Sequence, residues 1–191
     1  MMSNAAVAVH SPASHEGTYW LALALTPGLG PARIKKLIEQ YGMAERVFQA
    51  SLTELEASGM RAVSAQSLAT GKSLELGQEE CTKAVEAGAR IIAFSDPEYP
   101  LRLKEIYDPP VILFVKGSVE VLAQPGIAMV GTRHPTPYGS GMAERLSTDL
   151  ATRGLVIISG LARGIDTASH RGVVAAKGKT VAILGTGIDV I

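Results

Sequence analysis

Glycine, hydroxyl and arginine residues recur at the ends of three apolar runs in the last third of the chain. The turns that follow these runs are Gly131-Thr132-Arg133-His134, Ser159-Gly160-Leu161-Ala162-Arg163-Gly164 and Gly185-Thr186-Gly187. Glycine lets a ligand approach the backbone closely, and an arginine guanidinium can form two parallel hydrogen bonds with a phosphate. Together these groups are the chemistry of phosphate capture, so we expect the functional site to lie here.

The apolar runs themselves predict a parallel sheet. Residues 127–131, 155–160 and 180–185 are short and rich in β-branched side chains, which is typical of strands buried on both faces. A turn and a helix-like stretch follow each of the first two runs, so the expected order is βαβαβ. In such a sheet the turns after the strands gather at the carboxyl edge, where ligands bind. The predicted fold class is therefore α/β.

The residues before this sheet show mainly helical patterns. Helices are expected at 19–25, 31–41, 43–50, 52–57, 73–87 and 101–106, and further strands at 89–94 and 111–115. We expect a disordered tail at 1–17, a helical domain at 18–88 and an α/β domain at 89–191. Both further strands are then expected to join the α/β part.

The segment Thr26-Pro27-Gly28-Leu29-Gly30-Pro31 lies between two of the expected helices and has two interpretations. It resembles the hairpin of helix-hairpin-helix modules, in which glycines expose backbone N–H groups to a DNA phosphate. It also fits a plain tight turn, because glycine and proline end and begin helices in any case. Arg33, Lys35 and Lys36 follow the hairpin and leave the first interpretation open.

Composition excludes several classes of protein. Basic and acidic residues are equal in number, 18 each, so a phosphate site must be a local pocket and not a basic face. The single cysteine, Cys81, excludes an internal disulfide and a multi-cysteine zinc site. No apolar run approaches the roughly 20 residues of a membrane span, and residues 1–15 lack the pattern of a secretory signal. We expect a soluble, cytoplasmic protein with no membrane partner.

Two familiar nucleotide motifs fail on spacing or position. Residues 172–180 contain Gly-Lys-Thr, but five residues separate the two glycines and the segment precedes a strand, whereas a phosphate loop has four and follows one. Gly185-Thr186-Gly187 supplies only half of a dinucleotide fingerprint, and Gly131-Thr132-Arg133 lacks its second glycine. We therefore predict neither ATP hydrolysis nor a cofactor.

Catalytic and metal-binding groups are sparse. Asp166 and His170 are four residues apart on one expected helix and can meet, but nothing shows that His134 converges with them. We expect Asp166 to hold the turn from the helix N-terminus, where the helix dipole favours a carboxylate, and His170 to be a structural partner. Ser159 lacks the second flanking glycine of a nucleophile elbow. No catalytic residue and no metal are predicted.

These motifs together resemble the DNA-processing protein A family, also called DprA or Smf. The segments that carry the resemblance are Val130-Gly131-Thr132-Arg133, Thr136-Pro137-Tyr138-Gly139, and residues 96–117, 159–172 and 178–189. The likeness covers about residues 18–191. It implies a small helical domain of SAM or helix-hairpin-helix type, followed by an extended Rossmann domain that binds single-stranded DNA and passes it to RecA during natural transformation.

The resemblance implies a non-enzymatic protein that forms a homodimer at full length. Contacts with DNA are expected from Gly131, Thr132, Arg133, Tyr138, Ser159, Gly160, Arg163, Gly164, Lys179, Gly185 and Gly187. Tyr138 is the one evident stacking candidate, so backbone contacts should dominate. The alternative is a nucleotide-hydrolysing enzyme of the lysine-decarboxylase-like (LOG) type, although its glycine-rich signature is missing.

The family pattern continues past Ile191 with a tyrosine-proline pair, a basic residue and an asparagine. We therefore expect this chain to be truncated within an incomplete Rossmann-like sheet. The last strand would then leave apolar surface bare, so that the chain self-associates or its last residues are poorly ordered. DNA binding should be weaker than in a longer version. The family also has alanine where this chain has Ser169, which is a minor departure.

Overall fold

The computed structural model describes residues 13–190. The chain forms two compact units, Met1–Gly117 and Ser118–Ile191. The expected domain boundary after residue 88 falls inside the first unit. Most of the expected tail, residues 1–12, lies outside the described residues. Residues 15–17, which are also expected in that tail, form the first turn of a helix, where Ser14 Oγ accepts a hydrogen bond of 2.9 Å from the Gly17 N–H.

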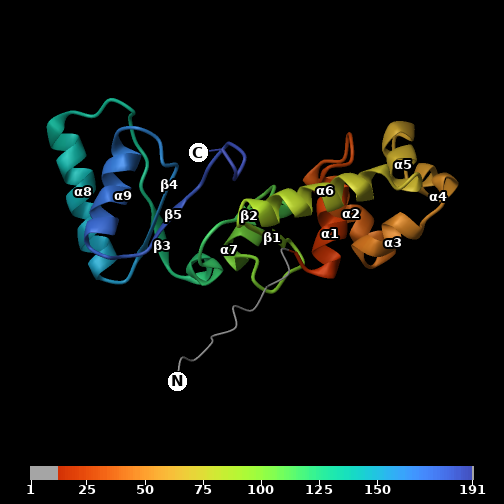
Figure 1. The fold of residues 1–191 in the computed structure, drawn as a ribbon, viewed down its shortest axis with the longest axis horizontal. Coiled ribbons are helices and arrows are strands. Elements are labelled where there is room, and N and C mark those ends of the chain that lie inside the picture. The colour runs from red at the N-terminus through yellow and green to blue at the C-terminus, as the bar shows by residue number, and fades with distance from the viewer. Residues whose placement is uncertain (1–12, 191) are drawn as a thin grey trace, which may run out of the picture. The chain divides into compact units, whose positions relative to one another are not determined.

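The first unit is mainly helical (Figure 1). Its elements are α1 (His15–Ala24), α2 (Pro31–Tyr41), α3 (Ala44–Gln49), α4 (Leu52–Ala57), α5 (Ala62–Ala69), α6 (Lys72–Glu86), β1 (Arg90–Ala93), α7 (Leu101–Lys104) and β2 (Ile112–Val115). The expected helices are present. Helix α5 was not anticipated, because it buries Ser64, Ala65 and Ser67 beside Leu68 and so lacks a large apolar stripe.

Strands β1 and β2 do not join the parallel sheet, which corrects the expectation. They pair with each other in antiparallel fashion, from Arg90 opposite Val115 to Ala93 opposite Ile112. The reason lies in the core of the first unit, since Ala93 and Val111 are buried in the same cluster as Trp20. An apolar strand pattern specifies burial but not the partner strand.

Hydrogen bonds of hydroxyl groups link the hairpin between α1 and α2 to α5 and α6. Thr26 and Ser73 are buried and hydrogen-bonded at 2.9 Å, and Ser67 is hydrogen-bonded to Ser73 at 2.8 Å. Ser64 Oγ donates to the Pro27 carbonyl oxygen at 2.6 Å. These contacts favour the interpretation of this segment as a tight structural turn.

The second unit contains the predicted βαβαβ order. Its elements are η1 (Val119–Ala123), β3 (Gly126–Ala128), α8 (Pro137–Thr152), β4 (Val156–Ser159), α9 (Ile165–Ala175) and β5 (Thr180–Ala182). The strands are parallel in the order β3-β4-β5, so the α/β class and the small parallel sheet are confirmed. Within residues 13–190, no helix is both long enough and apolar enough to cross a membrane.

Both helices of the second unit cover the same face of the sheet (Figure 1). The chain passes from β3 to β4 and from β4 to β5, each time to the neighbouring strand on the same side. Because both crossovers are right-handed, α8 and α9 lie side by side. Ile157 of β4 is therefore fully buried, whereas Val130 and Ile183, just past the outer strands, are 75% and 60% exposed. The expectation that all three strands are buried on both faces is wrong for β3 and β5.

Helices α8 and α9 pack closely because α9 carries a glycine at the contact. An added Cβ on Gly172 would collide with the Glu144 carbonyl oxygen, and Thr148 Oγ1 donates to the Gly172 carbonyl oxygen at 3.1 Å. Arg171 and Glu144 form an ion pair of 2.8 Å beside this contact. Gly172, the first glycine of the loop-like segment at residues 172–180, is thus a packing residue.

The contact between α1 and α6 gives a test of the first unit. An added Cβ on Gly77 of α6 would stand 2.9 Å from the Ala22 Cβ and 3.2 Å from the Ala22 N. Gly77→Ala should therefore lower the free energy of unfolding by about 1–3 kcal/mol, since overpacking outweighs the gain in helix propensity. Chemical denaturation followed by far-UV circular dichroism measures the change.

The matched control is Gly141→Ala in α8, where an added Cβ meets no atom within 4 Å. This substitution should raise the free energy of unfolding by about 0.5–1 kcal/mol. Stabilisation by both substitutions would contradict the close packing of α1 against α6.

Candidate functional site

The turns after β3 and β4 lie against each other at the carboxyl edge of the parallel sheet. The Ile165 N–H donates to the Thr132 carbonyl oxygen at 3.2 Å. Gly164 has a φ of +88°, and an added Cβ there would collide with the Thr132 carbonyl and stand 2.8 Å from the Arg133 Cα. An added Cβ on Gly131 would stand 2.6 Å from the Ile165 side chain. Two glycines therefore make the contact between the turns possible.

The turn between β4 and α9 is held from the first turns of α9. Asp166 is buried, and its Oδ2 accepts a hydrogen bond from the Gly160 N–H at 3.1 Å, which is the turn-holding contact expected for this residue. Thr167 bonds the Ala162 carbonyl oxygen through its N–H at 3.1 Å and its hydroxyl at 2.7 Å. Leu161, between these two anchors, has a φ of +55°.

Ser159 is used within the fold. Its Oγ donates to the Met129 carbonyl oxygen at 2.6 Å, which ties β4 to the end of β3, and the side chain is buried. The expected ligand role of Ser159 would require breaking this hydrogen bond. The hydroxyl therefore holds the end of β4 against the end of β3 and does not face solvent.

His170 lies on α9 and contacts β5. Its Nδ1 is 2.7 Å from Thr180 Oγ1, which itself donates to the Ile157 carbonyl oxygen at 2.7 Å. Because the single hydroxyl proton is committed to Ile157, Thr180 accepts from His170, and this assigns the Nδ1–H tautomer. Burial lowers the pKa of His170, and the Asp166 carboxylate and the Ser159 backbone partly offset that effect.

Arg133 and Arg163 are the cations of the two touching turns, and both are exposed. Within residues 13–190, neither guanidinium has a hydrogen-bond or ion-pair partner. Arg171, by contrast, is paired with Glu144. The two free guanidinium groups can thus serve a ligand.

The remaining predicted residues divide between the two edges of the sheet. Gly185 and Gly187 follow β5 at the carboxyl edge, and Tyr138 lies in the first turn of α8 with 77% of its surface exposed. Lys179 precedes β5 at the opposite, amino edge, where its Nζ donates to Gln124 Oε1 at 3.0 Å. The structure therefore does not bring Lys179 together with the other candidates.

Sequence reasoning missed Leu161 as a feature of the site. The flanking Gly160 and Gly164 signalled a turn, but they did not show that the left-handed conformation also falls on a leucine between them. His134 lies in the turn after β3, where its side chain is exposed and its backbone N–H donates to Thr132 Oγ1 at 3.1 Å. In the described part of the chain, no cluster of three histidine, cysteine or acidic side chains could hold a metal ion.

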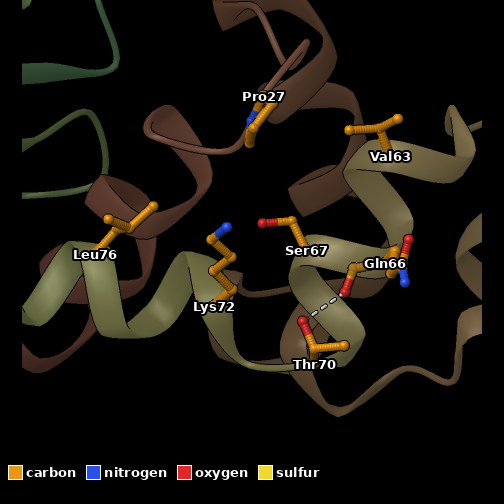
Figure 2. A pocket seen from close by; sticks show the side chains of 7 residues that line it. All are labelled: Pro27, Val63, Gln66, Ser67, Thr70, Lys72 and Leu76. Carbon is orange, nitrogen blue, oxygen red and sulfur yellow. Dashed lines mark hydrogen bonds between the residues drawn. The ribbon is translucent and has the colours of Figure 1, made fainter.

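The first unit contains a cleft of about 340 Å³ beside the α1–α2 hairpin (Figure 2). Its lining residues are Pro27, Val63, Gln66, Ser67, Thr70, Lys72 and Leu76. Lys72 is the single cation among them, and the hydroxyl of Thr70 is bonded to the Gln66 carbonyl oxygen at 2.8 Å. None of the predicted phosphate ligands lines this cleft, so the candidate site remains the sheet edge.

The chain is similar to DNA-processing proteins in sequence. Residues 90–191 match the family model described as DNA recombination-mediator protein A. Protein Smf of Synechocystis sp. is 33% identical, with 94% of this chain and 46% of the relative covered. DNA processing protein DprA of Bacillus subtilis is 43% identical, with 54% of this chain and 35% of the relative covered. The chain thus spans less than half the length of these relatives.

The fold is also similar to that of a solved structure. The X-ray structure of DNA processing protein A from Streptococcus pneumoniae matches with a TM-score of 0.70 and 29% identity, covering 93% of this chain and 60% of that chain. The family match begins at Arg90, the first residue of β1. Strands β1 and β2 therefore belong to the matched sequence region although they pack in the first unit.

Removal of the Asp166 carboxylate tests how the β4–α9 turn is held. Asp166→Ala leaves the Gly160 N–H without its partner, so the free energy of unfolding should fall by about 1–3 kcal/mol. Thermal denaturation measures this change, and an unchanged melting temperature would show that the turn does not need this contact.

Burial of His170 predicts a pH dependence of stability. Its pKa is lowered in the folded chain, whereas the unfolded chain titrates near the ordinary value of 6.5. The unfolded state therefore binds more protons, and the free energy of unfolding should fall as the pH drops below about 6.5. His170→Gln should flatten this part of the curve in urea titrations between about pH 5 and 7.5. His134→Gln, which removes an exposed histidine, is the control and should leave the curve unchanged.

Proposed function

The chain belongs to the DNA recombination-mediator protein A family, and on that premise we propose that the carboxyl edge of its parallel sheet binds single-stranded DNA. The observation that carries the proposal is the pair of exposed guanidinium groups of Arg133 and Arg163, which have no partner within residues 13–190 and lie on two turns whose backbones touch. Backbone contact between the turns limits how far apart the two cations can move. Such a pair suits two phosphates of one strand.

The mode of binding follows from the charges. Phosphate contacts position a strand but carry no base information, so binding through Arg133 and Arg163 should be independent of sequence. The chain has equal numbers of acidic and basic residues, so long-range steering contributes little and local contacts provide the affinity. Gly131 and Gly164 contribute indirectly, because their missing side chains allow the backbone contact between the two turns.

We extend the proposal to recombination during natural transformation, in which the protein would deliver the bound strand to RecA in the cytoplasm, as a homodimer at full length. The family resemblance supports these steps. We propose a binding protein and not an enzyme because Ser159 and Asp166, the buried polar side chains at the edge, already have partners within the fold. Release of free base from nucleoside monophosphates would favour the nucleotide-hydrolysing alternative.

Arg133→Ala is the direct test of the phosphate contact. Loss of one charge-assisted contact should weaken binding of single-stranded oligonucleotides of any sequence by about tenfold. It should also reduce the slope of log affinity against log salt by about 0.7. Fluorescence anisotropy across a salt series measures both quantities, and the same variant should be less able to promote RecA assembly on the strand.

Arg153→Ala provides the matched control. Arg153 lies at the C-terminal end of α8, which leads back to the amino edge of the sheet, and its guanidinium donates to the Asp149 carbonyl oxygen at 2.8 Å. This variant loses the same charge away from the site and should bind normally. Equal effects of the two substitutions, or normal binding by a folded Arg133→Ala variant, would remove Arg133 from the site.

A further inference from the structure

The cleft of the first unit is lined by one face of α5 and one face of α6. Lys72 and Leu76 are one turn apart on α6, and Pro27 of the hairpin completes the lining (Figure 2). The other face of α5 places Ala65 and Leu68 in the core. Helix α5 therefore has two distinct faces, one for the core and one for the cleft. Along α5 and its C-cap, the cleft residues follow the spacing of a single helix face: Val63, Gln66, Ser67 and Thr70.

The hydroxyl of Ser67 can only accept a hydrogen bond from a ligand in this cleft. A carbonyl oxygen has no proton to give, so the 2.8 Å contact between Thr26 Oγ1 and the Ala22 carbonyl oxygen uses the one hydroxyl proton of Thr26. Ser73 must then donate to Thr26 at 2.9 Å, and Ser67 must donate to Ser73 at 2.8 Å. Ser67 is only 9% exposed, and no donor within residues 13–190 bonds its oxygen.

Lys72 supplies a positive charge that is not neutralised. Its ammonium and the Ser67 hydroxyl point toward each other in Figure 2, and no ion pair or hydrogen bond joins Lys72 to any residue that the structure describes. Lys72 is also the first residue of α6, where the positive end of the helix dipole disfavours a cation. The helix itself therefore does not explain a lysine at this position, whereas an anionic ligand would.

Apolar side chains form the walls of the cleft. Val63 is 68% exposed and Leu76 is 37% exposed, so both can still lose water to a ligand. The volume of about 340 Å³ lies at the lower end of the range of roughly 300–1,000 Å³ that small ligands occupy. The cleft is thus sized for a small group and not for a whole helix.

We propose that this cleft captures the C-terminus of a partner polypeptide that ends in an apolar residue. The terminal carboxylate would pair with the Lys72 ammonium. A backbone N–H of the chain end would donate to Ser67 or Thr70, whose own hydroxyl protons are both committed within the unit. The last side chain would pack against Val63 and Leu76. A chain end carries the anion, the donor and the apolar group within one residue, as the size of the cleft requires.

A nucleotide also combines an anion with an apolar face, but the lining suits it less well. Among the described residues around the cleft, Lys72 is the only cation and none is an aromatic residue on which a base could stack. The cleft lies in the first unit, so this proposal is independent of DNA binding at the sheet edge. Either proposal can fail without the other.

Synthetic peptides test the proposal on the full chain. N-acetylated tetra-alanine, extended at the C-terminus by leucine, phenylalanine or valine, is prepared both as the free acid and as the C-terminal amide. Titrations are followed by the backbone amide signals of the isotope-labelled protein. At least one free acid should shift the signals of Ser67 and Lys72 with a Kd below about 1 mM. Its amide form should bind about tenfold more weakly, because the contact with Lys72 loses its charge.

Substitutions separate the two kinds of contact. Lys72→Gln should weaken binding of the free acid about tenfold and leave the amide form unchanged. Its melting temperature should stay the same or rise, since a cation leaves the N-terminus of α6. Val63→Ser should weaken binding of both forms. Lys83→Gln is the matched control, because Lys83 lies in the last turn of the same helix and pairs with Glu80 at 3.3 Å. This variant should bind as the unmodified chain does.

Three results would overturn the proposal. The first is equal affinity for the acid and amide forms, or normal binding of the acid by Lys72→Gln. The second is failure of all three free acids to shift the cleft signals at millimolar concentration. The third is tighter binding of adenosine monophosphate than of any peptide at the same signals, which would assign the cleft to a nucleotide.

Discussion

Backbone contact between the turns after β3 and β4 is the constraint on which the carboxyl edge of the sheet depends. Gly164 fits against Thr132 and Arg133 only because it lacks a side chain, and its positive φ would strain any other residue. The contact fixes the relative position of the turns that carry Arg133 and Arg163. Glycine here contributes to function through the position of its neighbours, before any contact of its own with a ligand.

Two sets of polar groups in the second unit have different roles. Ser159, Asp166, His170 and Thr180 bond backbone or side-chain partners within the unit and link α9 to β4 and β5. Arg133 and Arg163 have no such partners among the described residues. The first set is largely satisfied within the fold, although His170 Nε2 is buried without a hydrogen-bond partner among the described residues. Exposed guanidinium groups, in contrast, remain solvated at little cost until a ligand binds. The hydrogen bonds of the first set thus stabilise the part of the unit from which the two arginines project.

The sequence was most informative where local chemistry decides the structure. Helices α2 and α4 begin and end at the predicted residues. Turn composition also singled out Arg133 and Arg163, and the structure adds that both are exposed and have no partner among the described residues.

Features that depend on distant partners could not be derived in this way. The pairing of β1 with β2 follows from burial of Ala93 beside Trp20, and the position of Lys179 follows from strand direction. The conformation of Leu161 depends on Asp166 and Thr167, which act from the helix that follows the turn.

Helix α1 is the first described helix of the chain, yet its contacts include α6, β1 and β2, which are made much later during synthesis. Trp20 and Leu23 share a core with Ala93 and Val111. A ribosome adds about 5–20 residues per second, so the apolar face of α1 remains exposed to water for several seconds before its last partners emerge. The first unit therefore completes its folding only after β2 has been translated. A pause in translation before Val111 would prolong the period in which α1 is open to association with other chains.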